Sequence, residues 1–348
     1  MRRPFFFLMV ALSIVSCKGG RHQQEEIVEP EIVLPEEPVV TVDSSKVFAV
    51  RSGYKSWFLL VDGSPLNDEE FQNCRRFVGD LAAVRRHAKW GFVDRNGEEI
   101  VPCIYDKCEN FSEGMALVCM GDKYGFVNED MSNNIPCSYD ECRSFSEGLA
   151  AACLDGLWGF ISKSGKTVID FEFESCTSFD DGMASVMKDG IWEVIDKSGN
   201  PVSSVTFEEC PHFSENLAAY RTDGLCGFLD LDGNHVIEFT YDACGEFKEG
   251  LAAVQIDGKW GFIDKDGTMV VSAEYEDAGI FSEGCAAVCL DGKWGYIDKK
   301  GMPVTEFIYE KCYPFSRGYA IVRSGATFGV IDRSGDIIVD PVYDYVDW

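Results

Sequence analysis

The chain of 348 residues carries 59 acidic and 31 basic side chains, which gives a formal charge of −28. Apolar residues make up 46% of it and aromatic residues 13%, so a packed core can form and disorder of the whole chain is excluded. The excess of acid argues against binding to nucleic acid or to anionic lipid, because both need clustered Lys and Arg. With only four histidines present, no metal and no cofactor is predicted.

The N-terminal segment 1–16 predicts a secretion signal. A basic start is followed by an apolar run over residues 5–15, which is shorter than the roughly 20 residues that a membrane span needs. The run ends in Ile14-Val15-Ser16-Cys17, which resembles the lipobox of bacterial lipoproteins, although Leu is commoner than Ile14 at its position. This resemblance implies cleavage before Cys17 and lipidation of that residue; an ordinary signal peptide with a chance Cys is the alternative. Lys18, where an Asp would suggest inner-membrane retention, favours the outer membrane or the cell surface.

Residues 17–44 predict a tether between the lipidated Cys and the folded part. Like charges repel one another and proline stiffens the backbone, so a segment rich in both is extended and forms no core. We expect this tether to hold the folded part away from the membrane. Its acidic residues are Glu25, Glu26, Glu29, Glu31, Glu36 and Glu37, and its prolines are Pro30, Pro35 and Pro38.

From residue 45 onward the sequence repeats with a period of 34 residues. Eight regular units fill 77–348, and residues 45–76 look like a worn ninth unit that would cap the array. Each regular unit starts with Phe, has Ala five residues later and then an aromatic-Gly pair, from which Trp192-Glu193 and Cys226-Gly227 depart. The first residues of the units are Phe77, Phe111, Phe145, Phe179, Phe213, Phe247, Phe281 and Phe315.

This repeat resembles the bacterial WG-repeat family, also called the KWG-repeat family. The likeness is clearest at Lys259-Trp260-Gly261 within residues 247–267, and it extends over the whole repeat region. The resemblance implies short β-strands in tandem, often in envelope lipoproteins. It implies no generally established activity.

Each unit predicts three short strands and two tight turns. In the unit that starts at Phe247, residues 251–256, 259–264 and 268–275 favour strands, and Asp257-Gly258 is a strong hairpin signal. One such meander cannot bury enough surface to stand alone, so neighbouring units must stack. We therefore predict an all-β chain that forms an open β-hairpin solenoid or superhelix. A closed, propeller-like toroid is the alternative, although a three-stranded unit of this length is short for a propeller blade.

The cysteines recur on a ladder of their own. A secreted chain with 15 cysteines suggests disulfides, but Ala278 at one rung indicates that Cys acts there as a small buried apolar residue. A disulfide also needs Cα atoms within about 4.4–6.8 Å, and stacked hairpins are expected to lie further apart. We predict mainly buried free thiols, with some disulfides as the alternative. The rungs are Cys74, Cys108, Cys142, Cys176, Cys210, Cys244 and Cys312.

Two further ladders supply candidate binding residues. An acid follows the aromatic residue of the third predicted strand in every regular unit, and eight equal carboxylates do not suit catalysis, which needs groups in different environments. We expect these acids to accept backbone or Tyr hydrogen bonds, or to offer a stripe to a basic partner. The tryptophans either stack sugars or form the core between units, and Cys226 and Phe328 at equivalent positions favour the core. The candidate binding residues are Trp90, Trp158, Trp192, Trp260, Trp294, Asp106, Asp140, Asp242, Glu276 and Glu310.

The sequence contains no nucleophile elbow, Ser/His/Asp constellation, phosphate loop or dinucleotide fingerprint, so no enzyme is predicted. The prediction is a non-enzymatic, lipid-anchored envelope protein whose repeats bind another protein of the envelope. A binder of glycan or peptidoglycan that uses the aromatic ladder, and an inert structural spacer, are the alternatives.

Overall fold

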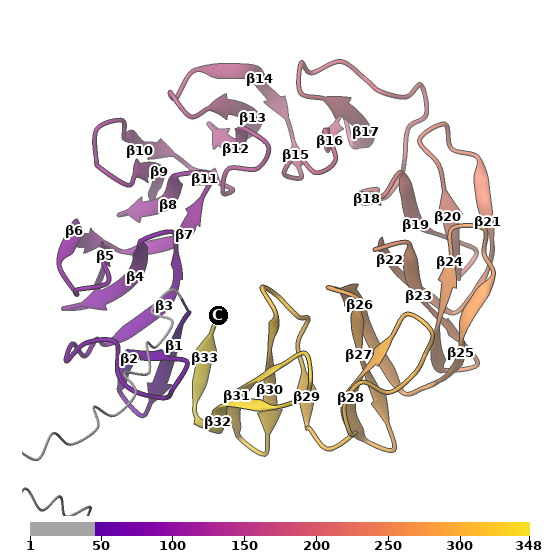
Figure 1. Ribbon diagram of the computed structural model, residues 1–348. Helices are drawn as coiled ribbons and strands as arrows, with labels where there is room; N and C mark the ends of the chain where they lie inside the picture. The colour runs from indigo at the N-terminus through magenta and orange to yellow at the C-terminus, as the bar shows by residue number, and fades with distance from the viewer. Residues whose placement is uncertain (1–45) are drawn as a thin grey trace, which may run out of the picture. The chain divides into compact units, whose positions relative to one another are not determined.

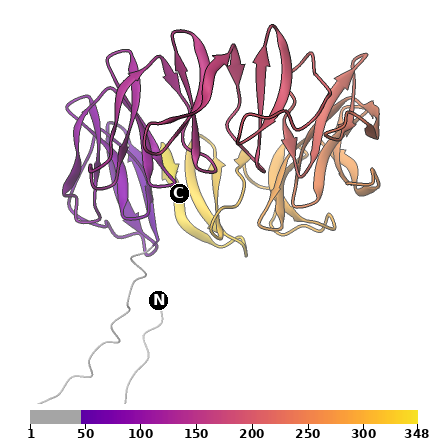
Figure 2. The ribbon, with the colours of Figure 1, turned by 90° about the horizontal axis from the view of Figure 1, so that it is seen from above.

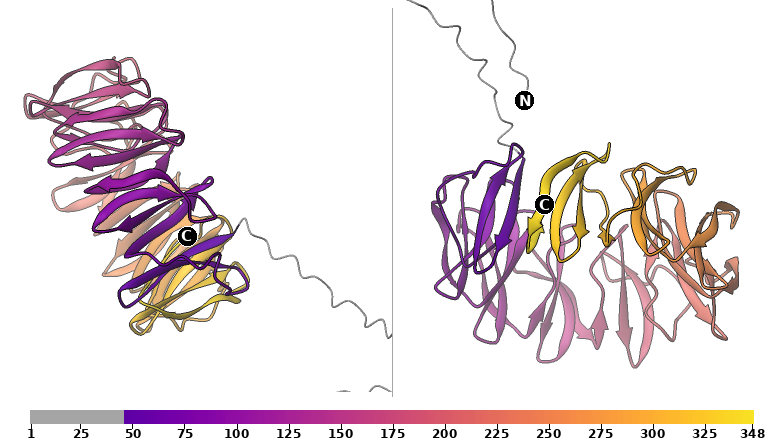
Figure 3. Two further views of the ribbon diagram at one scale, coloured as in Figure 1. Left: turned by 90° about the vertical axis from the view of Figure 1, so that its left-hand side faces the viewer. Right: turned by 90° about the horizontal axis from the view of Figure 1, so that it is seen from below.

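The computed structural model describes residues 46–348, which form nine small antiparallel sheets arranged as a closed ring (Figure 1). The sheets stand side by side around the ring, each with its face against the next (Figures 2 and 3). This arrangement is a nine-bladed β-propeller, with one sheet per blade. The signal segment, Cys17 and the tether predicted for residues 17–44 lie outside the described residues.

Within a blade, the chain runs from an inner strand at the inside of the ring to an outer strand at its circumference. The inner strands are β3 (Asn73–Val78), β7 (Lys107–Ser112), β11 (Glu141–Cys142), β15 (Ser175–Cys176), β18 (Phe213–Ser214), β22 (Ala243–Lys248), β26 (Asp277–Ser282), β29 (Lys311–Cys312) and β33 (Tyr345–Asp347). The second strands are β1 (Val47–Ser52), β4 (Leu81–Arg86), β8 (Met115–Met120), β12 (Leu149–Leu154), β16 (Met183–Lys188), β19 (Leu217–Thr222), β23 (Leu251–Ile256), β27 (Cys285–Leu290) and β30 (Tyr319–Ser324).

The third and outer strands complete the blades. The third strands are β2 (Lys55–Leu60), β5 (Lys89–Val93), β9 (Lys123–Asn128), β13 (Leu157–Ser162), β17 (Ile191–Asp196), β20 (Leu225–Leu229), β24 (Lys259–Asp264), β28 (Lys293–Asp298) and β31 (Thr327–Asp332). The outer strands are β6 (Glu99–Tyr105), β10 (Ile135–Tyr139), β14 (Thr167–Phe173), β21 (His235–Tyr241), β25 (Met269–Tyr275) and β32 (Ile337–Tyr343). In the three remaining blades the outer position is held by isolated bridges, such as Trp192 with Phe207.

The ring closes through a sheet that is built from both ends of the described chain. Strand β33 pairs antiparallel with β1, with Val346 opposite Val50, and so supplies the inner strand of the blade that contains β1 and β2. The prediction of an open solenoid is therefore wrong, and its alternative, the closed toroid, is confirmed. Residues 45–76 do contribute a ninth unit, but this unit is joined to its neighbours on both sides and caps nothing.

The prediction of three strands per unit is also wrong, because six of the nine blades have four. A four-stranded blade fits into a single repeat because its strands are short and most of its turns are tight. The strand that the sequence pattern did not reveal is the inner one. In β3, β7, β22 and β26 its pairing is interrupted by a β-bulge, as between Cys74 and Phe77, so alternation of apolar and polar residues is lost there.

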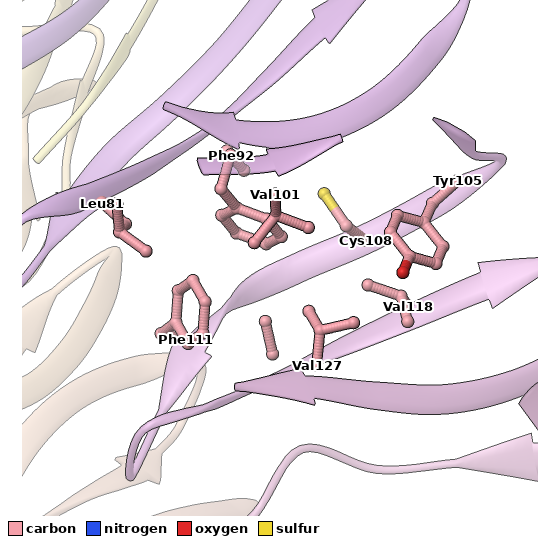
Figure 4. Packing of buried hydrophobic residues seen from close by; sticks show 10 residues of the cluster. Leu81, Phe92, Val101, Tyr105, Cys108, Phe111, Val118 and Val127 are labelled. Atoms are coloured by element: carbon pink, nitrogen blue, oxygen red, sulfur yellow. The ribbon is translucent and has the colours of Figure 1, made fainter. Parts of the chain in front are cut away.

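The hydrophobic core lies between the blades rather than within them. One cluster joins Phe92 and Val101 of one blade to Phe111, Val118 and Val127 of the next (Figure 4). The Phe ladder holds these interfaces together, since all its members except Phe213 meet an aromatic ring on the third strand of the preceding blade. Seven such pairs have ring centroids 4.6–4.8 Å apart, among them Phe92 with Phe111 and Phe262 with Phe281.

The Gly of the aromatic-Gly pair is required by the close approach of the outer strand. A Cβ atom placed on Gly261 would lie 2.5 Å from the carbonyl oxygen of Val271 and 2.7 Å from the nitrogen of Ala273. Both are backbone atoms, so neither can rotate away. Glu193 takes this position in the blade of β15–β17, where no regular outer strand is formed.

We expect Gly261→Ala to lower the free energy of unfolding by about 1–3 kcal/mol, the usual cost of overpacking. The methyl group must push β25 away from β24, which disturbs the ladder between them. Chemical denaturation followed by Trp fluorescence measures the change. Glu193→Ala is the matched control, since it places the same residue where no outer strand crosses; an equal loss in both variants would contradict this explanation.

The described part of the chain contains no helix that is long and apolar enough to cross a membrane. Within residues 46–348 no group of three or more His, Cys, Asp or Glu side chains is placed to hold a metal ion.

Candidate functional site

The acids that follow the last aromatic residue of each unit lie between the outer strand of one blade and the inner strand of the next. Their carboxylates join the turns of these two blades. Asp106 pairs with Lys89 of its own blade and accepts a 2.9 Å hydrogen bond from the backbone nitrogen of Gly121 in the next. Glu276 accepts from the nitrogen of Gly292 at 2.8 Å, Asp140 pairs with Lys123 and Glu310 with Lys293, and Asp242 accepts from Gly258. We call these five candidate residues the link acids. Four of them, Asp106, Asp140, Asp242 and Glu276, accept a hydrogen bond from a backbone nitrogen of the next blade and so hold neighbouring blades together, whereas Glu310 pairs with a Lys of its own blade.

The tryptophans lie on the third strands and pack against the clusters between blades. Trp294 is buried, and Trp90, Trp158, Trp192 and Trp260 are half-buried. Cations cover three of the rings: Arg75 lies 5.2 Å from the ring centroid of Trp90, Arg143 lies 5.3 Å from that of Trp158, and Lys311 lies 3.5 Å from that of Trp294. The five rings thus contribute to the packing between blades.

Six rungs of the cysteine ladder are free thiols, and each is buried or half-buried. Burial raises the pKa of Cys108, Cys176 and Cys312 to about 12, so these thiols stay protonated at neutral pH. The remaining rung, Cys244 on β22, forms a disulfide with Cys226 on β20 of the preceding blade. Their Cα atoms are 6.0 Å apart, so the expectation that neighbouring units lie too far apart for a disulfide is wrong at this position.

We expect reduction of the Cys226–Cys244 disulfide to lower the free energy of unfolding by about 3 kcal/mol, because it frees a loop with a sequence separation of 18 residues in the unfolded chain. Denaturation with and without a phosphine reductant measures this change. The same reductant should leave the double variant Cys226→Ala/Cys244→Ala unaffected. No shift in the wild-type protein would show that the two thiols are not joined.

Residues that the sequence analysis did not single out form a clasp between blades, on the opposite side of the ring from the link acids. The Glu in the turn after an inner strand accepts a hydrogen bond from the equivalent turn of the next blade, and it pairs with a Lys on that blade. Glu113, for example, accepts from the nitrogen of Gly148 at 2.9 Å and pairs with Lys163 at 3.2 Å. The same clasp is made by Glu147, Glu215, Glu249 and Glu283, the last with Arg333 as its cation.

The preceding Ser completes the clasp. Ser112 donates from its hydroxyl to the carbonyl oxygen of Phe145 at 2.6 Å, and Ser146, Ser214 and Ser282 make the same bond one blade further on. The signal was present in the sequence as the recurring run Phe-Ser-Glu-Gly, seen at 111–114, 145–148 and 281–284. Only the ring shows that the Ser and the Glu of this run bind the next blade, whereas its Phe packs on the preceding one.

The clasp predicts a dependence of stability on pH. Burial opposes ionisation of Glu113, Glu215 and Glu249, but hydrogen bonds from Lys and backbone groups outweigh it and hold the pKa of each carboxyl below its ordinary value of 4.5. A carboxyl whose pKa is lower in the folded than in the unfolded state stabilises the fold at any pH above its unfolded-state pKa. This stabilisation is lost as the pH falls through the folded-state pKa. We therefore expect the melting temperature to fall below about pH 4.5. Glu249→Gln should reduce the slope of this fall, and an unchanged slope would contradict the assignment.

The turns between the second and third strands carry a row of exposed acids, on the side of the ring where the link acids lie. Within residues 46–348 none of these six carboxylates accepts a hydrogen bond or pairs with a cation. Exposed aliphatic residues flank them, with Met120 and Ile191 each almost half exposed. We call this surface the aspartate face; it comprises Asp122, Asp155, Asp189, Asp223, Asp257 and Asp291 with the flanking residues Met120, Leu154, Leu157, Ile191, Leu225 and Ile256.

Comparison with known families gives a match along most of the repeat region. The family model described as "WG containing repeat" matches eight successive segments, which are residues 90–124, 124–158, 158–192, 194–226, 227–260, 260–294, 294–326 and 328–347. A search of curated proteins finds no match.

Several solved structures resemble the ring. A structure titled "Crystal structure of the eukaryotic initiation factor" has a TM-score of 0.61 and 11% identity, over 87% of this chain and 96% of that chain. Dihydro-heme d1 dehydrogenase NirN in complex with DHE has a TM-score of 0.44 and 15% identity, over 87% and 74%. Kluyveromyces lactis Hsv2 has a TM-score of 0.38 and 10% identity, over 63% and 89%. The first likeness shows a shared fold and carries no statement about function.

Proposed function

This chain belongs to the WG-containing repeat family, and we propose that its ring is a non-enzymatic scaffold that binds a basic protein through the aspartate face. The observation that carries this proposal is the contrast between two sets of acids on one side of the ring. The link acids, such as Asp106, are engaged in holding blades together, whereas the acids of the turns, such as Asp155, have no partner within residues 46–348.

The composition of the aspartate face supports a protein as the partner. Carboxylates in a row attract Lys and Arg over a distance and favour fast encounter with a basic surface. The exposed aliphatic side chains beside them add apolar contact area, which a protein surface can match and a polysaccharide matches poorly. The glycan-binding alternative has less support, because the tryptophans it needs are packed between blades and three are covered by cations.

A set of four substitutions tests the proposal. Asp155, Asp189, Asp223 and Asp257 all have positive φ values, which Asn tolerates as well as Asp does, so changing the four to Asn removes charge and keeps the turns. Binding is measured by capture from native envelope extract at low and high salt. We expect the wild-type protein to retain a basic protein that salt releases, and the fourfold variant to lose it.

The matched control removes the same charge from the circumference of the ring. Asp170, Glu238, Glu306 and Asp340 are exposed acids at equivalent outer positions of four blades, and their change to Asn or Gln should leave capture intact. If both variants lost capture equally, the effect would depend on net charge alone, and binding through the aspartate face would be contradicted. If both variants retained polysaccharide, the glycan-binding alternative would be favoured. If the wild-type protein retained nothing, the inert spacer would be favoured.

We also propose that the protein is anchored to the outer membrane or cell surface by a lipid on Cys17. This proposal rests on the resemblance of residues 14–17 to a lipobox. Labelling with a radioactive or alkyne-bearing fatty acid should mark the wild-type protein in cells, and Cys17→Ser should abolish the label and release the protein from membranes. A labelled Cys17→Ser variant would overturn the proposal.

A further inference from the structure

The arginines of the ring are gathered where the ring closes. Of the 11 arginines in residues 46–348, nine lie between 51 and 95 or between 317 and 333. These two stretches are far apart in sequence, but the pairing of β1 with β33 places their blades next to one another (Figure 1). We call the blades formed by residues 46–105 and 311–348 the closure sector.

The closure sector differs in charge from the rest of the ring. It carries 13 Lys and Arg against 13 Asp and Glu, whereas residues 106–310 carry 14 against 39. An anion that approaches the ring is therefore repelled by six blades and not by the other three. Four of the nine arginines are also held by an aromatic ring, namely Arg51 by Tyr345, Arg75 by Trp90, Arg86 by Phe71 and Arg95 by Phe77.

The Glu clasp is interrupted in the same sector. Arg317 stands in the turn where five other blades carry the clasp Glu, and Gly79 stands there in the blade of β3–β6. In the blade of β33, β1 and β2, the inner and second strands come from opposite ends of the described chain, so no such turn joins them. Within residues 46–348, three successive blades thus have no carboxylate at the clasp position of this turn.

A pocket of about 210 Å³ lies at this interruption, lined by Lys46, Arg76, Arg95, Arg317, Phe77 and Trp348. Its walls come from three blades and are fixed by contacts of their own. Arg76 pairs with Asp347 at 3.3 Å, Lys46 donates to the hydroxyl of Tyr319 at 2.9 Å, and the indole nitrogen of Trp348 donates to the carbonyl oxygen of Ser316 at 2.8 Å. Arg95 occupies the position that the clasp cations Lys163 and Lys197 hold in other blades, and it lies 3.7 Å from the carboxylate of Asp80 in its own blade.

We infer that this pocket binds a carboxylate-bearing segment of a protein partner, an Asp- or Glu-rich stretch that inserts the acid which the clasp lacks here. The regular clasps of the ring show how such a carboxylate would be bound, since each holds a carboxylate between a cation and a backbone N–H group. Guanidinium groups bind carboxylates through two parallel hydrogen bonds, which suits Arg317 and Arg76 to this ligand. The inference is independent of the aspartate face, which lies on the other side and takes a basic partner.

The test uses the full chain and a fluorescein-labelled hexaglutamate peptide, with binding followed by fluorescence anisotropy at low salt. Arg317→Glu restores the residue that five other blades carry, so the fold is expected to tolerate it. We expect this variant to bind hexaglutamate about tenfold more weakly, or worse. Arg317→Gln should give an intermediate loss, and hexaglutamine should not bind.

Lys166→Glu is the matched control, because it makes the same change of charge in an exposed turn on the same side of the ring, several blades away. It should weaken binding less than about twofold. Because the chain itself carries six glutamates between residues 25 and 37, the titration is repeated with these changed to Gln. Equal weakening by Arg317→Glu and Lys166→Glu, or no binding of hexaglutamate by the chain without its own six glutamates, would overturn the inference.

Discussion

Removal of residues 344–348 is expected to open the ring and to lower the free energy of unfolding by at least about 5 kcal/mol, a larger change than most single substitutions give. The segment contributes the inner strand of one blade, and Val346 in that strand is only 3% exposed. Trp348 packs on Phe48 with ring centroids 4.6 Å apart, and Asp344 accepts a hydrogen bond from the nitrogen of Gly53. Each buried apolar side chain contributes roughly 1.5–3 kcal/mol, and the loss also exposes the cluster around Phe48.

Two point variants distinguish the effect of ring closure from the effect of shortening the chain. Val346→Asp places a charge in the buried seam, whereas Val342→Asp places the same charge four residues earlier, at a position that is 61% exposed. Urea denaturation and small-angle scattering should show a large loss of stability and an expanded ring for Val346→Asp, and neither change for Val342→Asp. If the truncated chain unfolded at the same urea concentration as the wild type, a closed ring would be contradicted.

Phe262→Ala is expected to lower the free energy of unfolding by about 3–5 kcal/mol, the usual cost of emptying a large buried site. Phe262 is completely buried, and its ring meets that of Phe281 in the next blade at 4.8 Å. The cavity therefore weakens an interface between two blades as well as the core of one. Differential scanning calorimetry and chemical denaturation both measure the change.

Val270→Ala serves as the control for Phe262→Ala, because Val270 lies in the outer strand of the same blade and is 39% exposed. We expect its effect to stay within about 0.5 kcal/mol. A similar loss in both variants would mean that stability depends on the strands themselves and not on the packing between blades.

Much of a single blade could be predicted from the sequence. The turn at Asp257-Gly258, the strands on either side of it and the repeated Phe and Ala follow from local rules of turn geometry and alternation. The inner strand was missed because its bulge breaks the alternation, as between Cys244 and Phe247. The prediction that residues 45–76 form a cap was wrong for a related reason: no local pattern shows that β33, at the other end of the sequence, completes this blade.

The candidate site could be predicted less well. The link acids and the Trp ladder were visible in the sequence as repeated residues, but the residues that contact them were not. The sequence therefore could not distinguish Asp106, whose carboxylate joins two blades, from Asp155, whose carboxylate has no partner within residues 46–348. The disulfide between Cys226 and Cys244 depends on the distance between two blades, which no spacing in the sequence records.

The sequence by itself determined the repeat, the strands and turns that alternate along each unit, and the strongly acidic character of the chain, because these depend on neighbouring residues and on composition. The tertiary structure decided that nine blades close into a ring. Each blade is rotated slightly relative to the last, and only the sum of these rotations determines whether the ends meet. That meeting brings Arg76 beside Arg317 and makes a basic pocket in an acidic ring, from two stretches that the sequence keeps apart.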